Sequence, residues 1–189
     1  MIELLAALSA SAAAGIRLAL PLLIIGLLRT DLWSQVPLLS YFAPQVVLGV
    51  LVSWSLFELF ASKQLLGQRV LQITQIFFSP VVGAIMGVTI ARTTELPLWL
   101  VGLLGLIGGL LAFVLQLVQA GWFYRLRGLP LWAILLQDFL CIALVIFALD
   151  SPEEGGLIAL LLLWIAIRSS RDWYQWYTAQ RRPTKDDSL

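Results

Sequence analysis

Arg17 is the residue whose type and position point most directly to chemistry in this chain. It lies within residues 4–28, a stretch that carries no other charged side chain. In a straight helix over residues 2–28, Arg17 would lie about 22 Å from one end and about 16 Å from the other. A guanidinium at that depth in a bilayer needs a counter-charge, a watery cavity or a break in the helix. We therefore predict a polar site around Arg17 inside the membrane.

Two residues that disturb helices flank this charge. Pro21 removes the amide that would bond the carbonyl group of Arg17, and Gly15 loosens the turn just before it. Together the three residues resemble the broken helix of a transporter, in which a freed carbonyl and a local charge face a solute near the membrane midplane. The alternative is that Pro21 only kinks the helix and that Arg17 clamps it to a neighbouring carbonyl or carboxylate.

Two acids could neutralise Arg17. Glu58 lies about 7 Å inside the second apolar segment, and Asp138 lies deeper, within the fifth. If Arg17 pairs with one of them, the other becomes a candidate proton or cation site, because a buried carboxylate without a partner takes up a proton. The chain contains no histidine, so proton chemistry within it must use carboxylates.

Glutamines add a second set of buried polar groups. Gln72 and Gln75 are three residues apart, as are Gln116 and Gln119, so each pair lies on one face of its helix. These amides either hydrogen-bond across helices or line an aqueous path. Pro80, five residues after Gln75, predicts a further break or bend in the same helix.

Other kinds of chemistry are poorly represented. With one cysteine, Cys141, and no histidine, neither a disulfide within the chain nor a Cys/His metal site is expected. We find no Ser/His/Asp set and no phosphate-binding loop, and therefore expect no enzyme activity, no metal and no cofactor. The net charge of +1 and the lack of a basic face argue against nucleic acid as a partner.

The elements that must position these residues are membrane helices. With 60% hydrophobic and 12% charged residues, the chain is predicted to be an all-α, polytopic membrane helical bundle. We expect one membrane domain over residues 1–168, with halves 1–91 and 97–168, and a cytoplasmic amphipathic, basic tail over 169–189. About six transmembrane helices are predicted, over residues 2–28, 41–62, 70–91, 97–124, 130–149 and 155–168.

Charge placement orients the six predicted spans. Both termini then share a side with nine basic residues, whereas the other side holds only Arg29 and Arg92. The positive-inside rule predicts a multi-pass protein of the cell inner (plasma) membrane with both termini in the cytoplasm. Its partners would be the lipid bilayer and either a second copy or another membrane protein. The nine basic residues are Lys63, Arg69, Arg125, Arg127, Arg168, Arg171, Arg181, Arg182 and Lys185.

Small residues recur every four positions in two of the segments. This spacing is typical of faces where helices pack closely, and a lining for a narrow pore is the alternative. The residues are Ser79, Gly83 and Gly87 in one segment and Gly105 and Gly109 in the next. A looser match between the halves suggests a 3+3 inverted repeat. It pairs Gly15, Arg17 and Pro21 with Gly121, Arg125 and Pro130.

Three motifs make the chain similar to a bacterial membrane family known as domain of unknown function 4126. The family pattern Ala-Gly-x-Arg or Asn, followed by Leu-Pro-Leu, is matched at residues 14–22, and Glu-Phe-x-Ala-Asp-Lys at 58–63 with Ser62 for the Asp. Trp-Asp-x-x-Gln-x-x-x-Arg-Pro-x-x-Gly-Ala is matched at 71–84, with Gln72 and Ser79 for the Asp and Arg. The resemblance covers most of the chain and implies a membrane fold, but it brings no activity. If the family uses the Asp and Arg that Gln72 and Ser79 replace for ion coupling, this member has lost or altered that coupling.

The leading functional prediction is a transporter or channel-like bundle for a small solute or ion. The predicted path passes near Arg17, Glu58, Gln72, Gln75 and Asp138. The alternative is a non-transporting scaffold or assembly factor, in which the same groups lock helices together. A transporter requires a water-accessible cavity that reaches Arg17, whereas a scaffold requires Arg17 to be paired in a dry interior.

Overall fold

The computed structural model describes residues 2–28, 41–61, 65–93, 96–126, 128 and 130–180. This part of the chain is all-helical, which confirms the predicted fold class. Three stretches, Leu66–Arg92, Leu98–Arg125 and Leu131–Asp150, are long and apolar enough to cross a membrane, and the count of six spans stays a prediction. The helices are α1 (Ile2–Ile16), α2 (Ala19–Leu28), α3 (Pro44–Ala61), α4 (Leu65–Arg92), α5 (Leu98–Leu126), α6 (Leu131–Asp150) and α7 (Pro152–Gln180).

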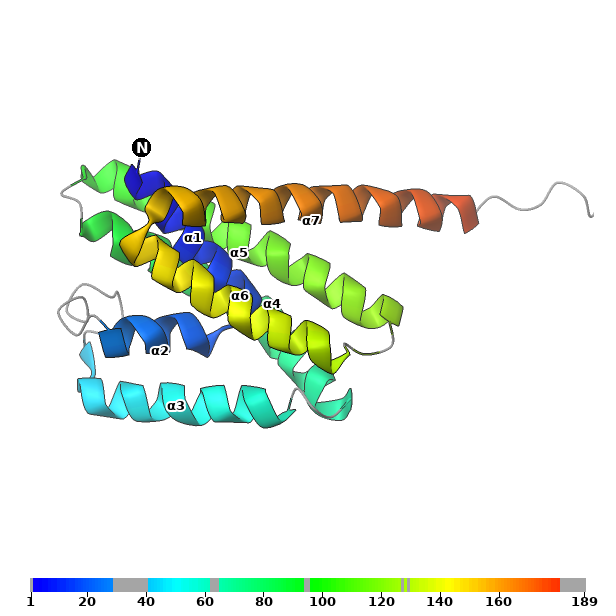
Figure 1. The fold of residues 1–189 in the computed structure, drawn as a ribbon, viewed down its shortest axis with the longest axis horizontal. Coiled ribbons are helices and arrows are strands. Elements are labelled where there is room, and N and C mark those ends of the chain that lie inside the picture. Colours follow the sequence, from blue (N-terminus) through cyan, green and yellow to red (C-terminus); the bar gives the residue numbers. More distant parts are fainter. Residues whose placement is uncertain are drawn as a thin grey trace, which may run out of the picture.

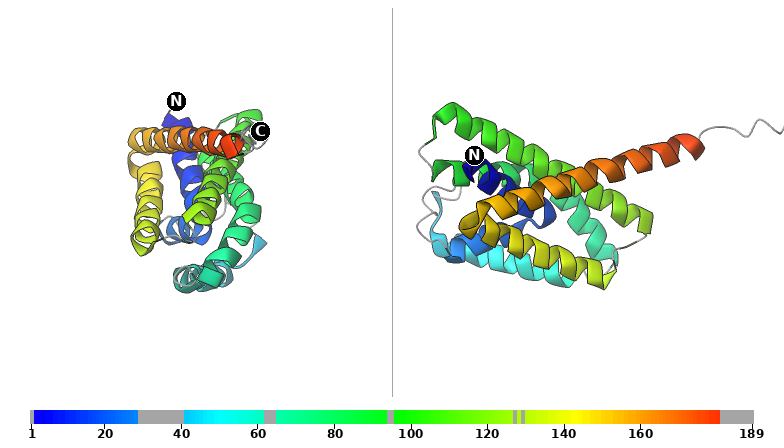
Figure 2. Two further views of the ribbon diagram at one scale, coloured as in Figure 1. Left: turned by 90° about the vertical axis from the view of Figure 1, so that its right-hand side faces the viewer. Right: turned by 45° about the horizontal axis from the view of Figure 1, so that its top comes forward.

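Helix α1 is the centre of the bundle, where it packs against α4, α5, α6 and α7 (Figures 1 and 2). Its sequence explains this position, because ten of its fifteen residues are buried and nearly all of these are alanine, serine or glycine. Small side chains let several helices approach one axis closely. Serines also reach across to neighbouring backbones: Ser9 Oγ donates to the Leu144 carbonyl at 2.7 Å and Ser11 Oγ to the Gly83 carbonyl at 3.0 Å.

Residues 2–28 do not form one straight helix. Helix α1 ends at Ile16 and α2 begins at Ala19, so the interruption falls on Arg17 and Leu18. The chain also changes direction there: α2 runs back toward the end of the bundle at which α1 starts, beside α3 and α6 (Figure 1). Pro21 is the third residue of α2, in the first turn, where a helix does not need the missing amide.

Helices α4 and α5 form the largest helix–helix contact in the described part of the chain. Glycines lie at this contact: a Cβ added to Gly87 would lie 2.7 Å from the Leu104 carbonyl oxygen, and one added to Gly109 would lie 2.8 Å from that of Pro80. Real Cβ atoms do not approach that closely, so only glycine allows the two backbones to meet at these points. The four-residue spacing thus corresponds to a packing face between α4 and α5.

The break predicted at Pro80 is not found. Helix α4 continues through Pro80 from Leu65 to Arg92. A proline removes one backbone hydrogen bond from a helix. Here α4 contacts both α1 and α5 directly before Pro80, through Ser79, and after it, through Gly83, so packing keeps the helix continuous.

Among its described residues, the second half of the chain has no counterpart of the interrupted helix. Gly121 and Arg125 lie within α5, which runs without a break, and Pro130 comes directly before α6. The local structure therefore does not support the repeat suggested by these residues.

Helix α7 continues to Gln180, past the predicted domain boundary at residue 168.

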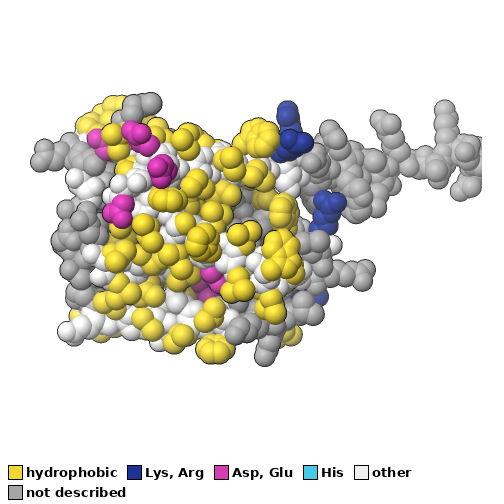
Figure 3. Space-filling view, in the orientation of Figure 1, with side chains coloured by type: hydrophobic (Ala, Val, Ile, Leu, Met, Phe, Trp, Pro, Cys, Tyr) yellow, Lys and Arg dark blue, Asp and Glu magenta, His cyan; other side chains and the backbone are white. Residues whose placement is uncertain are grey.

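The two ends of the bundle carry opposite charges, and an apolar surface lies between them (Figure 3). The acidic end, where α6 meets α7, exposes Asp150, Glu153 and Glu154, and with them one basic residue, Arg92, at the end of α4. The basic end exposes Arg125, Arg168 and Arg171. Other basic residues in the charge prediction, including Lys63, Arg127 and those of the tail, lie outside the described residues.

The described ends of the chain lie at opposite ends of the bundle. Ile2 lies at the acidic end, where Leu5 contacts Gly156 at the start of α7, and Gln180 lies beyond the basic end (Figure 1). The sequence predicts both termini on one side because it counts residues 2–28 as a full crossing. The structure differs because the chain turns back at Arg17.

Candidate functional site

Arg17 pairs with Asp138. Its Nε donates a hydrogen bond to Asp138 Oδ1 at 2.6 Å, and the two side chains are 6% and 18% exposed. Of the two acids considered from the sequence, the structure therefore brings Asp138 onto the guanidinium. Arg17 also follows the last residue of α1, where a positive charge is favourable because the carbonyl end of a helix carries partial negative charge.

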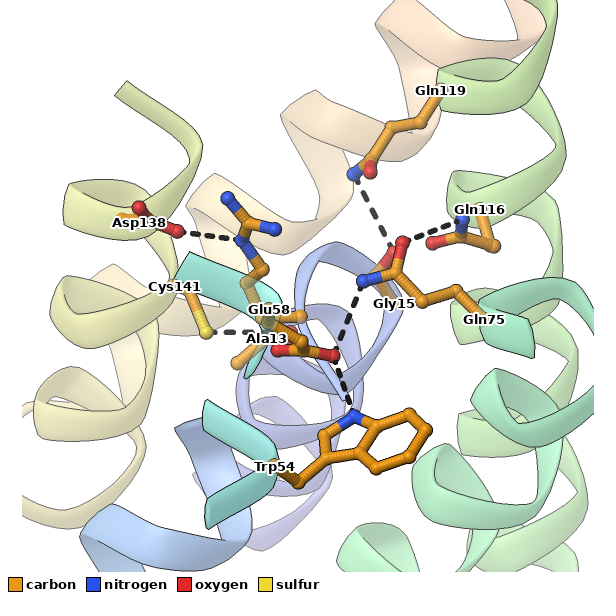
Figure 4. Close-up of polar contacts among 10 residues, drawn as sticks. Ala13, Gly15, Trp54, Glu58, Gln75, Gln116, Gln119, Asp138 and Cys141 are labelled. Carbon is orange, nitrogen blue, oxygen red and sulfur yellow. Dashed lines mark hydrogen bonds and ion pairs between the residues drawn. The ribbon is translucent and has the colours of Figure 1, made fainter. Parts of the chain in front are cut away.

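Three carbonyl groups at the end of α1 accept hydrogen bonds from side chains of three surrounding helices, and that of Ala13 also accepts one from Arg17 N at 3.0 Å. A helix leaves its last four carbonyls without partners inside the helix, and no lipid group can replace those bonds. Helices α4, α5 and α6 each supply one donor here, so this helix end is held in place inside the bundle. The bonds are Ser79 Oγ to Ala14 O at 3.3 Å and, as drawn in Figure 4, Gln119 Nε2 to Gly15 O at 3.4 Å and Cys141 Sγ to Ala13 O at 3.5 Å.

Gly15 serves a different purpose from the one predicted. It lies inside α1, and a Cβ at this position would lie 2.8 Å from Ala112 Cα of α5. The residue is therefore required for close helix packing rather than for a loosened turn. This packing determines where in the bundle α1 ends, and therefore where Arg17 lies.

Glu58 is the second acid of the site, and its two oxygens have different surroundings. The residue is 2% exposed. Its Oε1 accepts hydrogen bonds from Trp54 Nε1 at 3.0 Å and from Gln75 Nε2 at 3.3 Å (Figure 4). Its Oε2 is buried and has no hydrogen-bond partner among the described residues.

A cavity of about 190 Å³ lies between α2, α3 and α6, and Arg17, Glu58 and Asp138 all line it. Ser55 lines it as well, and its Oγ is also buried without a hydrogen-bond partner among the described residues. The cavity is large enough for several water molecules, and unsatisfied polar atoms are where buried water or a ligand binds. One guanidinium and two carboxyl groups therefore meet around a space that can hold a small polar species.

A second, smaller cavity of about 20 Å³ lies at the end of α1 and is also lined by Arg17. It is large enough for about one water molecule. Arg17 forms part of its wall, and most of its other polar lining is amide: Gln68, Gln72, Gln75, Gln119 and Gln137. Its lining comes largely from the starts of α4 and α6, which lie toward the basic end (Figure 1).

Hydrogen bonds between amides connect the small cavity to Glu58. Gln116 Nε2 donates to Gln72 Oε1 at 3.1 Å and to Gln75 Oε1 at 3.3 Å. Gln75 in turn donates to Glu58, so its side chain lies between the two cavities. The glutamines predicted from the sequence thus both bond across helices and line a cavity.

The structure brings all five predicted path residues into one region. Arg17 and Asp138 are bonded, Glu58 and Gln75 are bonded, and Gln72 joins them through Gln116. Sequence reasoning missed Trp54, Ser55 and Gln137. Trp54 and Ser55 precede Glu58 by four and three residues, a spacing that places them on its helical face and could have identified them.

Within the described part of the chain, no group of three or more Asp, Glu, His or Cys side chains is arranged to hold a metal ion. The chemistry available at this site is therefore that of one guanidinium, two carboxyl groups, a hydroxyl group and amides. These groups can bind a small polar solute or ion, or take up and release a proton.

Comparison with known proteins identifies one family. A search of curated proteins and a search of solved structures each found no match. A family model described as "Domain of unknown function (DUF4126)" matches residues 4–172, which include every residue of the site described above. The chain is therefore a member of the DUF4126 family.

Proposed function

We propose that this protein moves a small solute or ion across the membrane through the polar site at Arg17. The observation that carries the proposal is that Arg17 forms part of the wall of both cavities, the one between α2, α3 and α6 and the one lined by glutamines. A charged group shared by the walls of two cavities within an apolar bundle is suited to controlling passage between them.

The interrupted helix supports the same function. The carbonyl end of α1 and the amide end of α2 meet at Arg17 and Leu18, inside the bundle. In transporters with broken helices, such half-helix ends supply partial charges that bind the transported species. A helix that only had to fill space in a scaffold would gain nothing from ending there.

Two buried polar atoms without hydrogen-bond partners among the described residues also support a transport function. Each buried polar atom without a partner costs about 1–3 kcal/mol. Ser55 Oγ and Glu58 Oε2 both belong to residues that line the larger cavity. Neither bonds a neighbouring helix in the described part of the chain, so they do not lock the bundle. Water or a solute in the cavity supplies their missing partners.

Charge supports an orientation in the cell inner membrane. Arg125, Arg168 and Arg171 are exposed at the basic end, and the positive-inside rule assigns this end to the cytoplasm. The glutamine-lined cavity then faces the cytoplasmic half of the membrane. Ile2 and the acidic end face the opposite side.

Cysteine accessibility tests whether the site is a passage. In a Cys141→Ser background, single cysteines replace Ser55 in the larger cavity and Gln137 in the smaller one. Vesicles of both orientations are treated with a charged, membrane-impermeant methanethiosulfonate. We expect both positions to be labelled, because water reaches both cavities.

A matched control is Leu106→Cys. Leu106 lies in α5, is 62% exposed and lines neither cavity, so it faces lipid and should stay unlabelled. If neither Ser55→Cys nor Gln137→Cys reacts from either side, the interior is dry. That outcome would overturn the transport proposal in favour of the scaffold.

A further inference from the structure

We propose that the ion moved through this site is the proton and that Glu58 is the residue that carries it. The inference rests on the proposed function and names the species for which the site is built. It is carried by the hydrogen-bonding pattern of Glu58, by the pairing of Arg17 with Asp138 and by the position of Glu58 in the wall of the larger cavity, bonded to Gln75 of the smaller one.

The hydrogen bonds to Glu58 match a protonated carboxyl group. An ionised carboxylate has two equivalent acceptor oxygens, whereas a protonated one has an acceptor oxygen and an O–H group. Here Oε1 accepts two N–H groups, from Trp54 and Gln75, and Oε2 accepts none from the described residues. This asymmetry gives Oε1 the acceptor role and leaves Oε2 as the oxygen that binds the proton, with water in the larger cavity as the acceptor of its O–H group.

The charges around Glu58 lead to the same assignment. The guanidinium of Arg17 acts on both acids, but it is bonded to Asp138, so an ionised Glu58 would leave two negative charges beside one positive charge in an apolar interior. The other titratable group near it is the buried thiol of Cys141, on α6. Helix α4 presents the uncharged Gln75, and α2 contains no titratable residue. Within these surroundings a proton is the species that makes the site neutral.

Release of the proton gives the site a second state. When the proton leaves Oε2 for water, the new Glu58 carboxylate competes with Asp138 for the guanidinium of Arg17. The pair with Asp138 holds the end of α1 against α6, so deprotonation of Glu58 weakens that attachment. Uptake of another proton by Oε2 restores the first state. The charge of Glu58 is thereby linked to the charged group shared by the walls of the two cavities.

The proton route on one side is lined by amides. Gln75 bonds Glu58 and also lines the smaller cavity, where Gln72 and Gln119 provide further donors and acceptors. Amide side chains neither gain nor lose a proton near neutral pH, but they orient water molecules that pass protons on. The larger cavity gives Glu58 its connection on the other side, beside Ser55.

Infrared spectroscopy tests the proton on Glu58 directly. A buried protonated carboxyl group has a carbonyl stretching band that is separate from the carboxylate bands and shifts in D₂O. We expect the purified wild-type protein in lipid to show this band at neutral pH and the Glu58→Gln variant to lack it. Gln keeps an acceptor for Trp54 and Gln75, so this variant should fold. Glu153→Gln, which removes an exposed acid at the acidic end, is the matched control and should keep the band.

Proton flux provides the second measurement. Proteoliposomes containing a pH-sensitive dye are given a potassium diffusion potential with valinomycin. Wild type and Glu153→Gln should acidify or alkalinise the lumen according to the sign of the potential, and Glu58→Gln should fall to the rate of protein-free liposomes.

The outcomes separate the two proposals. A carboxyl band or a proton flux that survives in folded Glu58→Gln would overturn the assignment of the proton to Glu58. The proposed passage would still stand if Ser55→Cys and Gln137→Cys are labelled. Absence of labelling at both positions would overturn the passage itself, and the proton assignment with it.

Discussion

At the scale of single residues, the site depends on one cation shared between two acids. Arg17 is bonded to Asp138, and the bond joins residues 121 positions apart in the chain. Glu58 is bonded instead to Trp54 and Gln75. The ion pair thus has a structural part in holding α1 to α6, while Glu58 stays available for another species. The interpretations of Arg17 as a clamp and as part of a solute site are therefore compatible.

The ion pair can be tested by a double-mutant cycle. Removal of one partner leaves the other charge buried and unpaired, and this typically costs about 3–5 kcal/mol. We expect Arg17→Met to lower the unfolding temperature in detergent strongly, and Asp138→Leu to do the same. The double variant should recover most of the loss, because no charge remains uncompensated. Simple addition of the two losses would show that the side chains do not interact.

At the scale of elements, the interrupted helix and the glycine contact have separate tasks. Glycines allow α4 and α5 to approach closely, and Gly15 lets α1 approach α5. The resulting block of helices holds the end of α1 inside the bundle, where Ser79, Gln119 and Cys141 bond its last carbonyls. Helix α2 begins three residues after α1 ends, at Ala19, and forms one wall of the larger cavity.

The glycine contact predicts unequal effects of the same substitution within α5. A Cβ at Gly109 would lie 2.8 Å from the Pro80 carbonyl oxygen, whereas one at Gly102 would have no atom within 4 Å. We expect Gly109→Ala to destabilise the protein by about 1–3 kcal/mol, through forced displacement of α4. Gly102→Ala should be neutral or stabilising by up to about 1 kcal/mol, because alanine favours the helix. Thermal unfolding in detergent measures both, and equal effects would contradict the packing described here.

At the scale of the whole molecule, the reversal at Arg17 determines at which end of the bundle each described end of the chain lies. Ile2 and Leu28 lie at the same end of the bundle, and Gln180 lies at the other (Figure 1). The positive-inside bias of the described basic residues is unaffected, because Arg125, Arg168 and Arg171 remain together. What differs from the sequence prediction is the end of the bundle at which Ile2 lies.

Reporter fusions test this arrangement. Green fluorescent protein is fluorescent when it remains in the cytoplasm, and alkaline phosphatase is active only after export. With a reporter at each end in turn, we expect a cytoplasmic signal at the C-terminal end and an exported signal at the N-terminal end. Cytoplasmic signals at both ends would support six full crossings and contradict the reversal at Arg17.

Local properties of the sequence determined the fold class and most helix positions. The predicted segments 97–124 and 130–149 agree closely with α5 and α6, because long apolar runs bounded by charged or turn-forming residues are local features of a membrane chain. The candidate polar residues could also be identified from the sequence, since a polar group within an apolar run stands out without knowledge of its neighbours.

Only the tertiary structure decided what these residues contact. The pairing of Arg17 with Asp138, the unbonded Oε2 of Glu58 and the two cavities depend on how five helices are arranged around the end of α1. The reversal of α2 likewise depends on its contacts with α3 and α6, because a Gly, an Arg and a Pro in sequence are compatible with a kink as well as with a turn. Contacts between distant residues follow from packing, and hydropathy along the chain contains no information about them.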